Sequence, residues 1–182
     1  MLTITYFVHG TTTDNENGIS TGWNPGELST LGITQSKELK RLIAGKKFDV
    51  VFSSDLKRAV DSARFMFGDT FQTDERLREC NYGDLNGARE ATVEPLYLKH
   101  IDTPFPNGES MKNVEKRMHN FCEELLKKYN NQNIAIVAHK APQLALEVIV
   151  SGKTWVEAIR DDWRHKTPKA WQPGWEYVIM HL

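Results

Sequence analysis

Cysteine is scarce in this chain, and the residue spacings that usually bind metal ions are missing. The 182 residues include two cysteines, Cys80 and Cys122, with no Cys-x-x-Cys pair and no His-Glu-x-x-His segment. Disulfides are rare in reducing compartments, and zinc sites need closely spaced thiolate or imidazole ligands. We therefore expect a protein of the reducing cytoplasm that is not a zinc enzyme.

Long apolar runs and a surplus of basic charge are also missing. No basic segment followed by an apolar core stands at the N-terminus, and no apolar run approaches the about 20 residues that cross a bilayer. The formal net charge is -1, whereas nucleic-acid-binding domains usually carry a basic surplus. We expect a soluble protein whose partners are neither membranes nor nucleic acids.

Repeats, linkers and low-complexity segments are absent too, which predicts one domain over residues 1–182. A chain of this length buries about 70% of the surface of its unfolded state. The hydrophobic fraction of 40% and the charged fraction of 26% are ordinary for a globular domain.

What the chain does contain is a regular alternation of strand and helix patterns. Apolar runs predict strands at residues 2–8, 49–53, 134–138 and 177–181, and the polar segment 9–31 predicts a long loop that is either functional or disordered. Spacings of three and four predict helices between the strands, with Pro142 opening the last of them. The side chains expected on the buried faces of these helices are Ile33, Leu39, Leu42 and Ile43; Leu56, Val60, Ala63 and Phe67; and Met111, Val114, Met118, Phe121, Cys122 and Leu125.

This order of elements favours an α/β fold built as a three-layer sandwich. Its central sheet is expected to be mostly parallel, with helices on both faces. Ligands of such sheets bind beyond the carboxyl ends of the strands. Two histidines, His9 and His139, stand at such positions, directly after the first strand and after the strand at 134–138. Their convergence would suit phosphoryl chemistry or metal binding, and few further metal ligands accompany them.

Two more side chains near predicted strand ends, together with the histidines, suit phosphoryl chemistry. A neutral imidazole such as His9 is a competent nucleophile, and an arginine such as Arg58 matches phosphate oxygens with its planar fork. A partly buried glutamate such as Glu79 can give a proton to a leaving alkoxide, and the imidazole of His139 can balance charge on the equatorial oxygens. Ser53 and Ser54 are expected to shape the turn before Arg58 and to cap its helix.

Five segments carry these residues in a distinctive order. They are Val8-His9-Gly10-Thr11-Thr12-Thr13-Asp14-Asn15 with Gly22-Trp23 after it, Ser53-Ser54-Asp55-Leu56-Lys57-Arg58-Ala59, Leu77-Arg78-Glu79-Cys80-Asn81-Tyr82-Gly83-Asp84-Leu85-Asn86-Gly87, Pro106-Asn107-Gly108-Glu109-Ser110, and Val137-Ala138-His139. In this order they resemble the signatures of the histidine phosphatase superfamily, which includes the cofactor-dependent phosphoglycerate mutases. The resemblance covers residues 1–150 or so, and five ordered signatures are far more specific than one histidine-glycine pair.

The resemblance implies a role for each residue. His9 would attack phosphorus and carry the phosphoryl group, while Arg58, Asn15 and His139 would hold its oxygens. Glu79 would protonate the leaving group and then activate the water that releases phosphate. Gly10, Thr11 and Lys140 would also lie at the phosphate site, and no metal or cofactor is expected. A short cap insertion around residues 88–107 is expected to leave the site open to water, which favours hydrolysis over return of the phosphoryl group to the substrate.

Three positions depart from the family pattern. Val8 stands where the family has the arginine before the nucleophile, and losing one such donor costs about 10²–10³ in rate. Lys140 replaces the glycine after the second histidine, so it either supplies part of the missing charge as a point cation or points into water. Thr11 replaces the usual glutamate, which is a milder change.

Two further features have competing interpretations. Trp155, Trp163, Trp171 and Trp175 either pack the last helix and strand onto the sheet, or form an aromatic wall over the site or a surface for self-association. The segment Ser151-Gly152-Lys153-Thr154 imitates the end of a phosphate-binding loop, but Glu147 stands where that motif needs glycine. The remaining histidines are expected to be ordinary surface or packing residues: His100, His119, His165 and His181.

The sequence thus predicts hydrolysis of a phosphomonoester through phosphohistidine at His9, at a rate reduced by Val8. The substrate would be a small phosphorylated metabolite or a phosphoprotein. Two alternatives stay open: a weakly catalytic relative that binds a phosphorylated ligand, and a phosphotransferase of the phosphoglycerate mutase type. A purely structural interaction protein is a further reading, and it predicts no anion at the strand ends. The oligomeric state is open, with a homodimer among the options.

Overall fold

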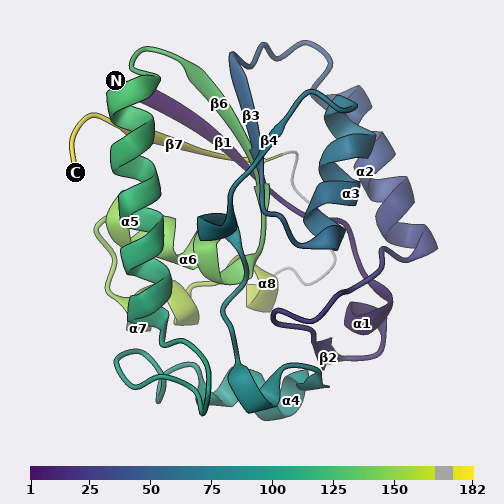
Figure 1. The fold of residues 1–182 in the computed structure, drawn as a ribbon, viewed down its shortest axis with the longest axis vertical. Coiled ribbons are helices and arrows are strands. Elements are labelled where there is room, and N and C mark those ends of the chain that lie inside the picture. The colour runs from purple at the N-terminus through teal and green to yellow at the C-terminus, as the bar shows by residue number, and fades with distance from the viewer. Residues whose placement is uncertain (167–173) are drawn as a thin grey trace.

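The apolar runs of the sequence form the inner strands of a five-stranded sheet in the computed structural model, which describes residues 1–166 and 174–182. The strand order is β4-β3-β6-β1-β7 (Figure 1). Neighbouring strands run parallel except β7, which lies antiparallel to β1 at the edge. The predicted mostly parallel sheet is therefore confirmed. The strands are β1 (Leu2–Val8), β3 (Val50–Ser53), β4 (Gln72–Thr73), β6 (Asn133–Ala138) and β7 (Trp175–Ile179).

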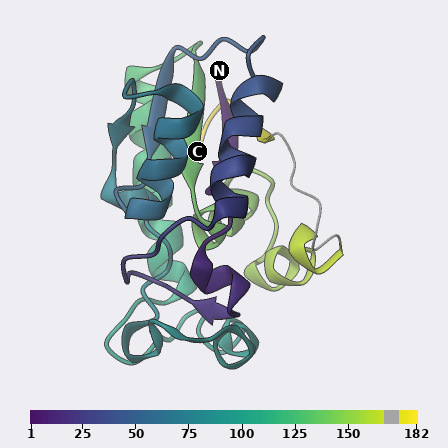
Figure 2. The ribbon, with the colours of Figure 1, turned by 90° about the vertical axis from the view of Figure 1, so that its right-hand side faces the viewer.

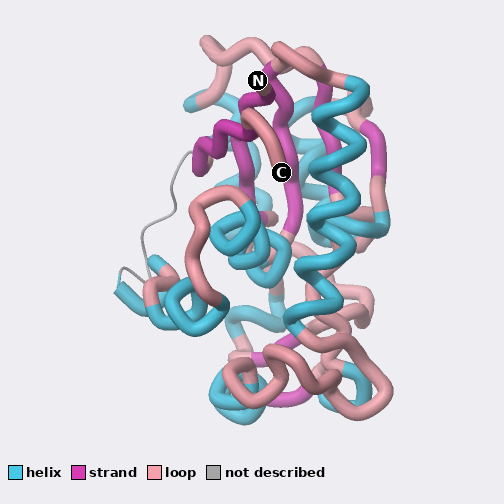
Figure 3. The backbone as a smooth tube through the Cα atoms, turned by 90° about the vertical axis from the view of Figure 1, so that its left-hand side faces the viewer, coloured by secondary structure: helices cyan, strands magenta, loops and turns pink. Residues whose placement is uncertain are grey.

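Helices cover both faces of this sheet, which completes the predicted three layers. Helices α2 (Thr30–Leu42) and α3 (Lys57–Phe67) pack together on one face. Helices α5 (Met111–Lys128) and α6 (Lys140–Ile149) pack together on the other, where α5 extends along most of the molecule (Figure 3).

The alternation of side chains along β1 explains why both faces are covered. Tyr6 is buried in the core beneath α5 and α6, whereas its neighbour Phe7 is buried in the smaller core beneath α2 and α3. Strand β6 alternates in the same way through Ile136 and Val137. An apolar residue at every position is what a strand buried on two faces requires.

Helix α5 follows its predicted pattern, since all six apolar residues expected on its inner face are buried. Its start is set by Ser110, whose hydroxyl accepts the N–H of Asn113 in a capping box. Helix α6 begins two residues before the predicted start, because Pro142 lies within the first turn, where no intrahelical N–H bond is needed.

Two helical stripes differ from the prediction. In α2 the buried line is Gly32, Ser36 and Leu39, continued by Ile43 just beyond its end, and Leu42 is 60% exposed. At 100° per residue, Leu42 lies well to one side of that line, so its prediction as a buried residue was wrong. In α3 the most buried residues are Arg58, Ala59, Ser62, Ala63 and Met66, whereas Leu56, Val60 and Phe67 are half-buried. The small residues of this stripe let α3 lie close to its neighbours.

Short elements gather beyond the carboxyl ends of the parallel strands. Strand β2 (Ile19–Ser20), from the long loop after β1, pairs with β5 (Ala88–Arg89), from the predicted cap. These strands, with α1 (Thr13–Glu16) and α4 (Glu90–Val93), lie below the sheet in Figure 1. Figure 2 shows α7 (Trp155–Arg160) and α8 (Trp163–Lys166) to one side of them. The remaining short helices are η1 (Glu75–Leu77), η2 (Gly83–Leu85) and η3 (Glu94–Leu96).

The tryptophans of the C-terminal region have different surroundings. Trp155 is 4% exposed and belongs to the core beneath α5 and α6, so it packs as the first interpretation expected. Trp163 and Trp175 stack with ring centroids 5.0 Å apart, which fixes α8 against the edge strand. Trp171 lies outside the described residues.

Candidate active site

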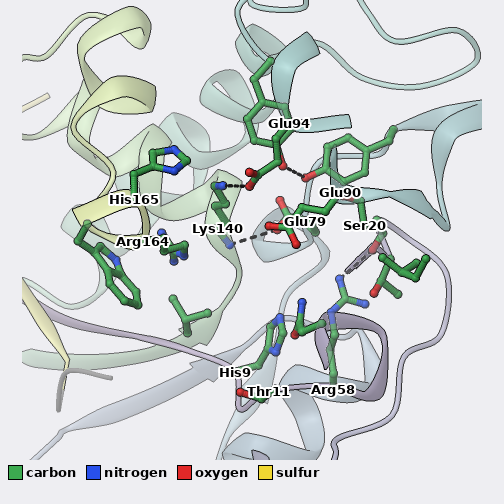
Figure 4. Close-up of a pocket in the computed structure, with 18 of the residues that line it drawn as sticks. His9, Thr11, Ser20, Arg58, Glu79, Glu90, Glu94, Lys140, Arg164 and His165 are labelled. Carbon is green, nitrogen blue, oxygen red and sulfur yellow. Dashed lines mark hydrogen bonds and ion pairs between the residues drawn. The ribbon is translucent and has the colours of Figure 1, made fainter. Parts of the chain in front are cut away.

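A cavity of about 710 Å³ opens where β1 and β6 end (Figure 4). Its walls come from the loop after β1, the start of α3, the segment around Glu79, the cap, the start of α6, and α8. Of the residues predicted for the site, six line it: His9, Thr11, Asn15, Arg58, Glu79 and Lys140. Gly10 and His139 do not belong to its lining.

His9 is held as a neutral imidazole with one nitrogen available. Its Nδ1 lies 2.7 Å from the carbonyl oxygen of Gly10, which can only accept, so Nδ1 carries the proton and Nε2 carries the lone pair. Burial, and next the positive charge of Arg58, lower its pKa from an ordinary 6.5 to about 3. A nucleophilic nitrogen is therefore ready at neutral pH without a general base.

His139 lies beside His9, with the two ring centroids 5.0 Å apart. The side chain is fully buried, and neither ring nitrogen has a hydrogen-bond partner among the described residues. Burial, followed by the charges of Arg58 and a protonated His9, places its pKa well below the usual value. A buried polar group without a partner in the protein is costly.

Arg58 brings a buried guanidinium to the cavity from the first turn of α3, and 2% of it is exposed. It donates to the carbonyl oxygens of Gly22 at 2.8 Å and Asn24 at 3.2 Å. These bonds use two of its five N–H groups, so the others remain for an anion. Ser54 accepts the N–H of Leu56 and shapes the turn before Arg58, but α3 has no side-chain cap, so the capping role expected of the serines is not seen.

Glu79 faces the cavity with its carboxylate held by backbone donors. Oε1 accepts the N–H groups of Cys80 at 2.8 Å and Ala141 at 3.0 Å, and Oε2 accepts that of Lys140 at 3.2 Å. Two of these donors are the first residues of α6, where the helix dipole also favours a negative group. Oε2 has the single, longer contact, so it is the oxygen with room for a further hydrogen-bond partner.

Gly10 supports His9 rather than lining the site. Its N–H donates to Ser62 Oγ at 3.0 Å, and its carbonyl accepts from His9. Thr11 lines the cavity, with its own N–H donating to Gln35 Oε1 at 2.9 Å. Asn15 also lines it, and its Oδ1 accepts from Thr12 in the capping box of α1, which leaves the amide nitrogen for a ligand.

Lys140 lines the cavity but turns toward the cap. Its ammonium pairs with Glu94 and lies 3.4 Å from Asp162 Oδ2 and 5.2 Å from the centre of the Tyr97 ring. Its side chain is 15% exposed, and in Figure 4 it points toward Glu94 and away from His9. Of the two directions left open for Lys140, toward the phosphate or into water, the side chain takes neither, since it pairs with Glu94 and lies near Asp162.

Several residues of the cavity were not predicted. Glu90, Glu94 and Tyr97 line it from the cap, and burial, with the adjacent Glu94 as a lesser cause, raises the pKa of Glu90. Arg164 and His165 line it from α8, and His165 is exposed there, as a surface residue was expected to be. The run Asp161-Asp162-Trp163-Arg164-His165-Lys166 is conspicuous in the sequence, but no local pattern in it indicates that Arg164 faces the site.

A protein-family model matches most of the chain, including every segment that contributes to the cavity. Residues 6–170 match the model described as the histidine phosphatase superfamily, branch 1. The chain belongs to the histidine phosphatase superfamily.

Within the described ranges 1–166 and 174–182, no group of three or more His, Cys, Asp and Glu side chains has the arrangement of a metal site. No helix in those ranges is long and apolar enough to span a bilayer.

Relatives in the histidine phosphatase superfamily include both phosphatases and mutases. The chain is 32% identical over 155 residues to the "Putative phosphoserine phosphatase 2" of Hydrogenobacter thermophilus, covering 79% of this chain and 76% of that protein. It is 30% identical over 164 residues to the 2,3-bisphosphoglycerate-dependent phosphoglycerate mutase of Methylocella silvestris, covering 80% of each. A mycobacterial glucosyl-3-phosphoglycerate phosphatase solved with VO3 is similar in structure, with a TM-score of 0.77, 26% identity and coverage of 87% of this chain and 86% of that one.

Proposed function

We propose that this protein hydrolyses a phosphomonoester through a phosphohistidine on His9. The observation that carries the proposal is the fixed tautomer of His9. Its Nδ1 is bonded to the Gly10 carbonyl, so Nε2 is free beside the buried guanidinium of Arg58. Phosphoryl transfer depends chiefly on positioning and on stabilising charge, and these groups provide both.

The first half of the reaction forms one bond and breaks another. His9 Nε2 attacks phosphorus, the P–O bond to the alcohol breaks, and the departing alkoxide takes a proton from Glu79 Oε2. Arg58 and the amide of Asn15 donate to the equatorial oxygens, and an N–H of His139 supplies a further bond. The proton that Glu79 gives must be present on its carboxyl group when the ester binds.

The second half returns the enzyme to its starting state. A water gives a proton to Glu79, its oxygen attacks phosphorus, and the P–N bond to His9 breaks. Inorganic phosphate leaves, and His9 again holds its proton on Nδ1. The short cap around residues 88–107 supports water as the acceptor, since little chain covers the site. We propose a small phosphorylated metabolite or a phosphoprotein as the substrate.

The test is phosphate release from a broad panel of phosphomonoesters, with His9→Ala prepared identically. Loss of the nucleophile is expected to lower the rate by more than about 10³-fold. Release that persists in His9→Ala would overturn the proposal. In water enriched in ¹⁸O, the label is expected in the inorganic phosphate, whereas transfer to an added alcohol without label would indicate a mutase-type reaction.

The role of Glu79 has a separate test. Glu79→Gln is expected to lower kcat/KM, which reports formation of the phosphohistidine, about 10²–10⁴-fold for alkyl phosphates. The loss should be much smaller for an aryl phosphate, because a phenolate leaves without being protonated first. An equal loss for both leaving groups would contradict the role of Glu79 as the acid.

Val8 supports a second candidate function, which is binding of a phosphorylated ligand without turnover. The cavity has no arginine at position 8 to stabilise the transition state. Vanadate binding by a folded protein that releases no phosphate from the whole panel would favour this candidate. Val8→Arg would then be the next variant to assay.

A further inference from the structure

Val8 leaves one wall of the cavity without the cation that its position could provide. The side chain is apolar, half-buried against the core beneath α5 and α6, and part of the cavity lining. Arg58 approaches from the opposite face of the sheet, on α3. A phosphoryl dianion at His9 would therefore meet strong positive charge on one side only, unless another residue supplied it.

Arg164 supplies a guanidinium to the same cavity from α8, far along the chain (Figure 4). Its Nη1 donates to Asp162 Oδ1 at 2.8 Å, and its Nη2 donates to Gln143 Oε1 at 2.8 Å. Both acceptors are buried, at 4% and 3% exposure. The guanidinium also lies 4.6 Å from the ring centre of Trp163. A long side chain held at three points has already lost the freedom that binding would otherwise cost.

These contacts leave Arg164 able to bind an anion. The two hydrogen bonds use two of its five N–H groups. Gln143 lies on the first turns of α6, the helix that packs on the Val8 side of the sheet. The anchoring of Arg164 to α6 therefore places its guanidinium on the face of the sheet that Arg58 does not serve.

The electrostatic effect of Arg164 reaches the residues on both sides of Val8. Its positive charge contributes to lowering the pKa of His9 and the pKa of Tyr6, although burial dominates in His9 and opposes it in Tyr6. Lys140 faces the cap instead, where its ammonium pairs with Glu94, and it shares the Asp162 carboxylate with Arg164. Among the cationic residues that the structure describes in this lining, Arg164 is the one placed to act beside Val8.

We propose that Arg164 is a phosphate-binding residue of this site, and that it replaces from the C-terminal segment the charge that Val8 lacks. The ligand group is a tetrahedral oxyanion, held between Arg58 and Arg164 with His9 in line. This inference rests on the proposed function of the site. It predicts that Arg164 stabilises both bound inorganic oxyanions and the transition state.

The first experiment compares Arg164→Gln and Arg164→Lys with the wild type. Arg164→Gln is expected to lower kcat/KM about 10²–10³-fold and to weaken vanadate binding, measured by calorimetry, at least tenfold. Arg164→Lys should recover part of both losses, because an ammonium keeps the charge but not the fork. Arg160→Gln, at an exposed position on α7, is the matched control and should change neither. Thermal unfolding of each variant reports whether the fold is kept.

Vanadate separates failure of this inference from failure of the proposed function. A wild type that releases no phosphate but binds vanadate through Arg164 would reject hydrolysis and keep the inference. If the wild type and Arg164→Gln release phosphate at the same rate and bind vanadate with the same affinity, the inference is rejected and hydrolysis is kept.

The second experiment restores an arginine at position 8. In the Arg164→Gln background, Val8→Arg is expected to raise kcat/KM at least tenfold, and in the wild type it should raise kcat/KM much less. Equal gains in both backgrounds would show that the two positions act independently. They would overturn the proposal that Arg164 supplies the charge that Val8 lacks. Should Val8→Arg fail to fold, the vanadate affinities of the Gln and Lys variants decide the matter alone.

Discussion

Gly10 shows, at the scale of one residue, how backbone packing orients the imidazole of His9. A Cβ atom built on Gly10 would lie 2.4 Å from the carbonyl oxygen of Gly32, at the start of α2. A Cβ on Gly32 would in turn lie 2.0 Å from the carbonyl oxygen of Thr11. The loop after β1 therefore touches α2 backbone to backbone. This contact fixes the Gly10 carbonyl, to which His9 Nδ1 donates.

Gly10→Ala is accordingly expected to harm both stability and catalysis. The added methyl group can be accommodated only by moving backbone, so the free energy of unfolding should fall by about 1–3 kcal/mol. The Gly10 carbonyl would move with it, and kcat should fall because His9 loses its alignment. Chemical denaturation and steady-state kinetics measure the two effects.

Gly45→Ala is the control for this change. A Cβ on Gly45 has no atom within 4 Å, so this variant should unfold within about 0.5 kcal/mol of the wild type or be slightly more stable. If Gly10→Ala behaves like Gly45→Ala, the close approach of the loop and α2 does not orient His9.

At the scale of elements, α5 holds the segment that carries Glu79. Arg117 on α5 donates to the carbonyl oxygens of Arg76 at 2.6 Å, Arg78 at 2.7 Å and Glu79 at 3.0 Å. It also pairs with the Glu109 carboxylate at 2.9 Å. One guanidinium thus binds three backbone carbonyl oxygens from η1 to Glu79.

Arg117→Met is expected to displace Glu79 without touching the phosphate site. The carbonyl oxygens and Glu109 would lose a charged donor, which should cost on the order of 3 kcal/mol of stability. The rate constant kcat should fall more than tenfold for alkyl phosphates while KM changes little, because Glu79 acts on the leaving group. Lys116→Met, at an exposed position on the same helix, should have neither effect. A large rise in KM with kcat unchanged would point to a damaged binding site instead.

The elements also show which parts of the fold could be predicted from sequence. Strand β6 and the inner face of α5 followed from local periodicity, because strands buried on two faces and amphipathic helices have distinct patterns. The exposed position of Leu42 could not be predicted from periodicity. The buried face of α2 includes Gly32 and Ser36, which a search for apolar residues does not detect. Packing between α2 and the loop after β1, rather than hydrophobicity, selects that face.

The residues of the site also separate into those that could be predicted from sequence and those that could not. His9, Arg58 and Glu79 stand in signatures whose order along the chain is distinctive, so sequence alone could nominate them, and the structure places all three on one cavity. The direction of Lys140 depends on Glu94 in the cap, and the position of Arg164 depends on Gln143 in α6. Contacts between distant segments leave no local pattern, which is why Arg164 was missed.

At the scale of the whole molecule, the imidazoles of His9 and His139 make the free energy of unfolding depend on pH. His9 has a pKa of about 3, and the pKa of His139 is well below its usual value; burial is the first cause in both. In the unfolded chain both would titrate near pH 6.5. Below that pH the unfolded state binds protons that the folded state does not, so the free energy of unfolding falls as the pH falls.

His139→Gln is therefore expected to make stability less dependent on acid. Each buried neutral histidine adds up to about 1.4 kcal/mol per pH unit to the slope between pH 6.5 and its folded-state pKa. Denaturant melts of the wild type between pH 7 and pH 4 should lose stability more steeply than those of His139→Gln, by up to that amount. His181→Gln, at an exposed position near the C-terminus, should keep the slope of the wild type. Parallel curves for His139→Gln and the wild type would mean that the His139 imidazole takes up its proton over the same pH range in the folded and the unfolded chain, which would contradict the lowered pKa.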